Sequence, residues 1–238
     1  MRNATPEARA LGNSFRESGF DLIRSLQVAQ YNQDLAEANR LPDFGRPDAL
    51  VLVLGNTRKL WNRFIEDLAA NPALVDVPDP LDAWVESKVQ CVLKPIEVPA
   101  VACFAHRTDE RIIGMQRLGQ LSGLGFVGPC HLSVHRAFGP WVSFRAAVVF
   151  DLACDPLPLG AVDTCSGCVS KPCMAQYERV GEMDGELGFD AMRSRWQDWL
   201  AIRQACTVGQ EYAFTPHQAA YHYTHDRRWL LESLKGSK

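Results

Sequence analysis

The chain has 238 residues, of which 47% are hydrophobic and 22% are charged, a balance typical of a globular protein with a sizeable core. Its formal net charge is -3, and no stripe of Lys and Arg stands out, so charge excludes sequence-independent binding to nucleic acid. The longest apolar run, residues 49–54, is far shorter than the roughly 20 residues that a membrane-spanning helix needs. Because the N-terminus also lacks an apolar secretory segment, we expect a soluble, cytoplasmic protein.

The first half of the chain predicts helices around buried strands. Residues 5–39 have a helical pattern with a break near Ser18-Gly19, and the unbroken apolar run at 49–54 is typical of a buried strand. A helix should follow at once, because Gly55-Asn56-Thr57 offers an N-cap before apolar residues at fourth positions. The next expected elements are a helix over 79–93, a central strand over 98–105 and a helix from 108 to the glycines at 123–125.

Two alternating segments predict a β-hairpin. Residues 130–135 and 141–150 alternate polar and apolar side chains, and the five residues between them suit a hairpin loop. One face would carry polar side chains and a tryptophan: His131, Ser133, His135, Trp141, Ser143 and Arg145. This face either meets water or meets a ligand. An exposed tryptophan is costly, which favours the ligand.

The last third of the chain combines a long loop with helices. Residues 152–185 are rich in Pro, Gly and Cys and are expected to form a loop. An amphipathic helix is predicted from Phe189 onward, and a last helix over 215–234.

Three of the eight cysteines fall in one short stretch. Cys165, Cys168 and Cys173 have spacings found among metal ligands, and Cys206 would be a fourth ligand. An iron–sulfur cluster, a zinc ion, a redox-active dithiol and plain reduced thiols all agree with this pattern. The spacing Gly123-x-Gly125-x-x-Gly128 follows a helix, whereas a dinucleotide site would require a preceding strand.

Several motifs in order resemble the MMACHC (CblC) cobalamin-processing family. The segment from His135 to Arg145 has the pattern His-x-x-Phe-Gly-x-Trp-x-x-x-Arg of that family. Trp196-x-Asp-Trp and Gln218-x-Ala-Tyr resemble two of its later segments, and residues 19–32 resemble its opening. A second resemblance, through Gly125-Phe126-x-Gly128, Asp151 and the clustered cysteines, is to the cobalamin-binding core of epoxyqueuosine reductases.

The resemblance implies an α+β fold like that of flavin nitroreductases, with a central mixed or antiparallel sheet flanked by helices. Residues 1–151 would form the core, 152–185 a Cys-rich insert, and 186–238 helices that complete the same domain. It also implies an enzyme that binds cobalamin base-off and removes its upper axial ligand, by reductive decyanation or thiol-dependent dealkylation. A flavin (FMN or FAD) or glutathione would supply the electrons, and the sequence leaves open whether the chain forms a homodimer.

The same resemblance assigns roles to particular residues. Those expected against cobalamin are Gly125, Phe126, Gly128, His135, Phe138, Gly139 and Trp141. Those expected to bind a thiol or another anionic cosubstrate are Arg145, Arg203 and Arg228. In an alternative function, a cobalamin-dependent iron–sulfur reductase, Asp151 would donate a proton. In a third, the chain is a non-catalytic cobalamin carrier with the cysteines around a structural zinc.

Overall fold

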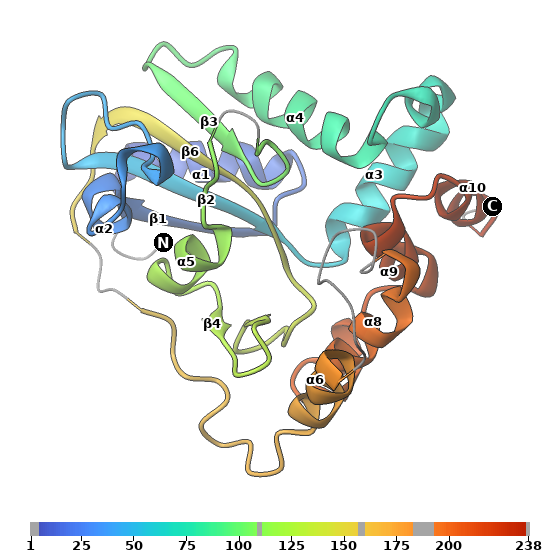
Figure 1. Cartoon of the computed structure of the whole chain (residues 1–238). Coiled ribbons are helices and arrows are strands. Elements are labelled where there is room, and N and C mark those ends of the chain that lie inside the picture. The colour runs from blue at the N-terminus through green and yellow to red at the C-terminus, as the bar shows by residue number, and fades with distance from the viewer. Residues whose placement is uncertain (1–4, 109–110, 157–159, 183–192, 237–238) are drawn as a thin grey trace.

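The structure, a computed structural model, describes residues 5–108, 111–156, 160–182 and 193–236. Four strands form its main sheet in the order β1-β2-β6-β3, and all neighbouring strands are antiparallel. Their bounds are β1 Leu22–Gln27, β2 Ala49–Asn56, β3 Ala100–Phe104 and β6 Ser143–Ala153. Figure 1 shows helices against the sheet and a group of C-terminal helices beside it. The expected α+β class with an antiparallel sheet is confirmed, and the described residues contain no parallel pair of a mixed sheet.

The core lies on both faces of the sheet, which explains the unbroken apolar run in β2. Leu50, Leu52 and Leu54 belong to one buried cluster, whereas Val51 and Val53 belong to another on the opposite face. The first cluster is completed by α1 (Pro6–Glu17), α3 (Lys59–Ala70) and α4 (Pro80–Leu93). The second is completed by α2 (Val28–Asn32) and α5 (Met115–Leu121). The predicted helices at α3 and α4 are confirmed.

Two expectations about the sheet are wrong. Residues 22–27 form β1 rather than part of a helix, because Ile23 and Leu26 gain burial by pairing with β2, a contact that local propensity does not encode. The strand expected in the centre is β3, which lies at the edge. The 11-residue β6 lies between β2 and β3 and contacts both.

The predicted hairpin between 130–135 and 141–150 is also wrong. Its first half contains only the two-residue β5 (Ser133–Val134), which pairs with β4 (Phe126–Val127) in a small separate sheet. Both edges of β6 are already occupied by β2 and β3, so β6 has no edge left for β5. The intervening turn is closed by the bridge His135–Gly139, with two backbone hydrogen bonds of 2.8 Å.

The C-terminal half holds more helix than expected. The predicted loop contains α6 (Pro172–Glu182), and the predicted last helix is divided into α9 (Pro216–Thr224) and α10 (Arg228–Lys235). The division occurs at His225, whose φ of +52° is left-handed and ends α9. The predicted amphipathic helix is α8 (Trp196–Ala205), and its expected beginning at 189–192 lies outside the described residues.

The remaining helical turns are η1 (Glu37–Asn39), η2 (Pro72–Asp76) and η3 (Gln210–Tyr212). The helix expected from Thr108 is the shorter α5, which begins after Gly114; residues 109–110 of the predicted cap lie outside the described residues. Among the described helices, none combines the length and the apolar character needed to cross a membrane.

Candidate functional site

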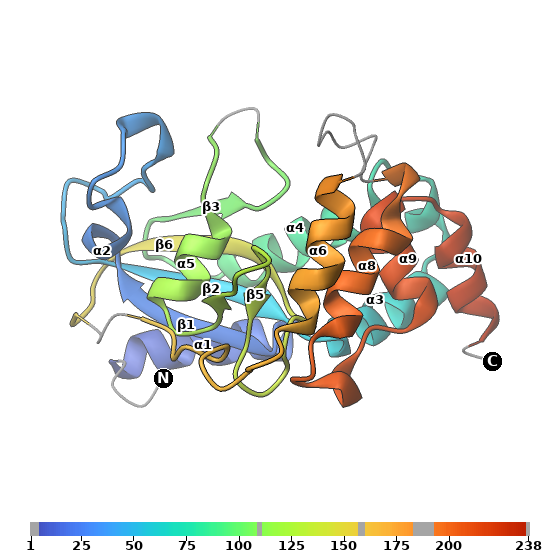
Figure 2. The ribbon, with the colours of Figure 1, turned by 60° about the horizontal axis from the view of Figure 1, so that its bottom comes forward.

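Two adjoining cavities lie between the sheet and the C-terminal helices, and they share Arg145 and His222 as lining residues. The first has a volume of about 420 Å³ and is lined by residues of α4, of α9 and of the segment after β3. The second has a volume of about 330 Å³ and is lined by residues of α5, β5, β6 and α8. Figure 2 shows α6, α8 and α9 standing beside the sheet at this place. We take the two cavities together as the candidate site.

Arg145 is a buried cation with an unused donor. It lies near the start of β6, and its Nε donates to Oδ1 of Asn56 at 2.8 Å, while its Nη1 lies 4.0 Å from Oδ1 of Asp82. Nη2 is buried and has no hydrogen-bond partner among the described residues. Burial lowers the pKa of Arg145, and the Asp82 carboxylate opposes this shift. A buried guanidinium with a spare N–H favours a carboxylate or phosphate ligand.

His222 is neutral in the folded protein. Burial lowers its pKa well below the usual value of 6.5, and the positive charges of Arg145 and Arg203 act in the same direction. Its neighbour Tyr221 stays protonated, because burial raises the pKa of the phenol to about 12. A neutral imidazole and a phenol can both accept and donate hydrogen bonds at neutral pH. These uncharged groups therefore lie beside the guanidinium of Arg145 in the first cavity.

Arg203 links α8 to the wall of the second cavity. Its Nε donates to the hydroxyl oxygen of Tyr223 at 2.9 Å, and its Nη1 donates to the carbonyl oxygen of Pro140. The guanidinium carbon also lies 6.0 Å from the ring centroid of Phe214. Arg203 thus holds the turn before β6 in place, and it lines the same cavity as Arg145.

His135 and Phe138 form a fixed pair at the tip of the turn. The His135 ring stacks on the Phe138 ring with centroids 4.7 Å apart. Its Nδ1 accepts hydrogen bonds from the backbone N–H groups of Ala137 and Phe138, so the neutral ring carries its proton on Nε2. Burial lowers the pKa of His135, and the nearby cation Arg24 contributes in the same direction.

Gly139 and Trp141 both make close contacts within the chain, which the sequence did not reveal. Gly139 has a φ of +57°, and a Cβ there would lie 1.9 Å from the carbonyl oxygen of Val208. The chain's own backbone at Val208 makes this close approach, and the predicted contact of Gly139 with a corrin stays a prediction. Trp141 is 2% exposed and packs on Phe214 with ring centroids 5.6 Å apart, and its predicted contact with cobalamin stays a prediction.

Two predicted site residues lie away from the cavities. Arg228 is exposed on α10, where it contacts Asp226 at 3.0 Å and covers the ring of Trp229. Asp151 lies toward the other end of β6 from Arg145 and pairs with Arg46 at 3.3 Å. The structure therefore brings Arg145 and Arg203 together and leaves Arg228 and Asp151 apart from them.

The glycine-rich segment reaches the edge of the second cavity. A Cβ on Gly125 would lie 3.4 Å from both the Phe144 ring and the Cβ of Ser133, two side chains that line this cavity. Phe126 pairs with Val134 across the small sheet. Gly128 is farther along, and a Cβ there would lie 3.2 Å from Sγ of Cys165. Gly125 therefore lies against two side chains of the second cavity, whereas Gly128 lies beside the cysteine cluster.

The four predicted metal ligands lie around one small cavity of about 20 Å³: Cys165, Cys168, Cys173 and Cys206. A fifth cysteine, Cys130, also lines it and hydrogen-bonds to Cys173. Burial, followed by the neighbouring Cys130, raises the pKa of the Cys173 thiol to about 12. Within the described ranges no three His, Cys, Asp or Glu side chains are arranged to hold a metal ion. The four predicted ligands therefore lie together, and metal binding by them stays a prediction.

Sequence reasoning assigned no role in the site to Asn56, Asp82, Cys130 or His222. Asn56 appeared only as part of a helix cap, although a buried Asn at the end of an apolar strand is a recognisable signal. Cys130 stands 35 residues before Cys165 and so belongs to no spacing motif.

Comparison with known proteins supports one class of fold. No protein-family model and no curated protein matches the chain. Solved structures do match, and they define an α+β fold shared by proteins of cobalamin trafficking and of tRNA modification. One is a C. elegans B12-trafficking protein CblC, a homologue of human MMACHC, with 14% identity and a TM-score of 0.64. The match covers 95% of this chain and 96% of that one.

Epoxyqueuosine reductases are similar over a smaller part of their own length. The Bacillus subtilis enzyme has 12% identity and a TM-score of 0.54, and the match covers 89% of this chain but 68% of that one. A structure of an epoxyqueuosine reductase with a tRNA-Tyr stem loop gives the same values. At these identities the likeness shows the fold alone. Both of the resemblances read from the motifs agree with it.

Proposed function

We propose that the chain binds a cobalamin at the two joined cavities and removes its upper axial ligand. The observation that carries this proposal is the buried Nη2 of Arg145, which lacks a hydrogen-bond partner in the described structure at a cavity of a CblC-like fold. Ser133, also on the cavity wall, has a buried hydroxyl in the same condition. Buried donors without partners are costly, so a ligand that accepts from them gains affinity.

The wall of the second cavity suits a corrin. Its apolar side chains are Met115, Leu132, Val142 and Phe144, with Ser133 and Arg145 as donors among them. A corrin is a broad apolar ring with amide groups around its rim, and this composition matches a wall with a few placed donors. Cobalamin is larger than either cavity, so only part of it would enter. We also propose that the fold is of the flavin nitroreductase type.

The bound cobalt would accept electrons from an external reductant as cyanide leaves, or would keep the bonding electron pair as a thiolate takes an alkyl ligand. The chain's own residues would exclude water, orient the corrin and bind the cosubstrate. Arg145 and Arg203 line one cavity and favour an anionic electron donor, such as the carboxylates of a thiol like glutathione or the phosphate of a flavin. Arg228 lies outside this arrangement and is not assigned to it.

A matched pair of variants tests the cosubstrate role. Arg145→Gln should raise the glutathione concentration needed for half-maximal dealkylation of methylcobalamin about tenfold, because one charge-assisted contact is worth ~1.4 kcal/mol. The control Arg228→Gln changes an exposed arginine outside the cavities and should leave this concentration unchanged. Equal effects of the two substitutions would contradict the assignment.

Cyanide release separates the enzyme from a carrier. Under anaerobic conditions with a reductant, the protein should release cyanide from cyanocobalamin faster than the reductant alone. Binding without any acceleration would show a carrier. A reductase of the epoxyqueuosine type has less support, because its expected proton donor Asp151 pairs with Arg46 toward the far end of β6.

A further inference from the structure

The edge strand β3 exposes a row of backbone groups. Ala105 N–H donates to the Arg145 carbonyl and Asp151 N–H donates to the Pro99 carbonyl, each at 2.9 Å. In an antiparallel ladder these bonds recur at every second residue, so 99, 101, 103 and 105 face β6. Ala100 and Ala102 therefore turn their N–H and C=O groups to the opposite edge, which pairs with no strand among the described residues. Phe104 has the same orientation, but its carbonyl oxygen already accepts from the Arg107 N–H at 3.3 Å.

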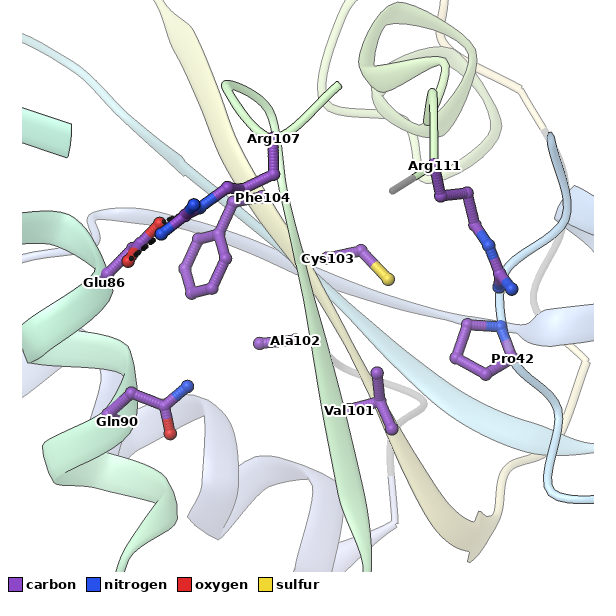
Figure 3. Close-up of a pocket in the computed structure, with 9 residues that line it drawn as sticks. All are labelled: Pro42, Glu86, Gln90, Val101, Ala102, Cys103, Phe104, Arg107 and Arg111. Atoms are coloured by element: carbon purple, nitrogen blue, oxygen red, sulfur yellow. Dashed lines mark hydrogen bonds and ion pairs between the residues drawn. The ribbon is translucent and has the colours of Figure 1, made fainter. Parts of the chain in front are cut away.

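A trough runs along this edge. Its cavity volume is about 480 Å³, and Figure 3 shows β3 between two walls. Glu86 and Gln90 of α4 form one wall, and Pro42 and Arg111 form the other. Natural proteins usually protect an edge strand with a charge or a proline, and the sequence Ala-Val-Ala-Cys-Phe of β3 contains neither. The unprotected edge between two walls has the form of a site for one added strand.

The charge of the trough selects the side chains of that strand. The Glu86 carboxylate is already bound by Arg107, at 2.7 and 3.1 Å, and by His106 at 2.7 Å. Arg111 donates from Nη1 to the carbonyl oxygen of Arg40. Because this acceptor is neutral, the hydrogen bond does not compensate the positive charge of Arg111. A carboxylate on the added strand near Arg111 would compensate this charge.

We propose that the β3 edge binds an extended, acidic segment of a partner protein as a fifth strand of the sheet. The segment's backbone pairs with Ala100 and Ala102, and an acidic side chain lies beside Arg111. A second copy of β3 would bring its own α4 and its own wall of Pro42 and Arg111 into the same trough. A single extended segment therefore fits better. The proposal is independent of the cobalamin site, which lies on other residues.

A fluorescent peptide of eight residues that alternates Thr and Val, with one Glu at its centre, tests this surface by anisotropy. The full chain should bind it, and Ala102→Pro should weaken binding at least tenfold. Proline removes an N–H that points to the free edge, and it takes no bond from the β3–β6 ladder. The matched control Ala102→Ser keeps the N–H and should bind as the parent protein does. Arg111→Glu should weaken binding about tenfold and reverse the preference toward a peptide with Lys in place of Glu.

The ligand side gives a second route if Ala102→Pro does not fold. The same peptide N-methylated at alternate residues should lose binding when one set of amides is blocked and keep it when the other set is blocked. Absence of binding up to about 1 mM peptide, which corresponds to about -4.1 kcal/mol, would overturn the proposal. So would equal binding of the Glu and Lys peptides, or a dimer in light scattering that Arg111→Glu leaves intact and Ala102→Pro dissolves, since the occupant would then be a second copy.

Discussion

The guanidinium of Arg145 is held by Asn56, whose Oδ1 accepts from Nε at 2.8 Å. Asn56 ends β2 and is fully buried, and its Nδ2 donates to the carbonyl oxygen of Thr57 at 2.7 Å. The amide therefore joins β2 to β6 and sets the direction of the Arg145 fork before any ligand binds. Nη2 is left at the cavity as a consequence.

Asn56→Ala should destabilise the protein by about 2–3 kcal/mol, because it removes a hydrogen bond to a charged group and leaves buried polar atoms without partners. Urea unfolding measures this change in the free energy of unfolding. Asn62→Ala, at an exposed position of α3, is the matched control and should change stability by less than about 0.5 kcal/mol. Equal stability of the two variants would contradict the role of Asn56.

Gly139→Ala should be far more damaging than Gly45→Ala. Both glycines have left-handed backbone, with φ of +57° and +73°, so each alanine carries a strain of about 1–2 kcal/mol. Only at Gly139 would the new Cβ meet backbone, at 1.9 Å from the Val208 carbonyl oxygen, whereas nothing lies within 4 Å at Gly45. We expect Gly139→Ala to lower the midpoint of thermal unfolding by several degrees more than Gly45→Ala. Similar midpoints would show that 208–209 does not pack on the turn.

Stability should fall as pH decreases below about 6.5. The folded pKa of His222 lies well below the usual value of 6.5 that the unfolded chain regains, so the unfolded state binds more protons between these two pKa values. Its contribution is complete above 6.5 and is lost as pH falls toward the folded pKa. His222→Gln should reduce the loss of stability between pH 7.5 and 5.5 in urea unfolding. The exposed Asn62, which has no titratable side chain, changed to Gln, should not. An identical pH dependence in His222→Gln would refute this origin.

Much of the fold could be predicted where the sequence pattern is local. The buried strand at 49–54 and the helices over 59–70 and 80–93 follow from apolar periodicity and caps. The strand at 22–27 and the place of β5 could not be predicted, because they depend on which strand edges remain free after β6 has paired. The break of the last helix at His225 requires a left-handed residue that is not glycine.

The candidate site was predicted in part, for a similar reason. Arg145 and Arg203 were found through motif resemblance, and the structure places them on one cavity. Trp141 occurs in the same motif and packs on Phe214, a contact with a distant segment that alternation along the chain does not reveal. Asn56 and His222 act through contacts between distant segments, which no local spacing reveals.

The most direct measurement of the central claim is an absorbance titration of cyanocobalamin with the purified protein. We predict binding at about one to one, with a spectrum that shifts to the base-off form, and weaker binding for Arg145→Gln than for Arg228→Gln. An unchanged spectrum at every excess of a protein that is folded by circular dichroism would contradict it. The β3 edge would be unaffected by that result, because its peptide assay involves no cobalamin.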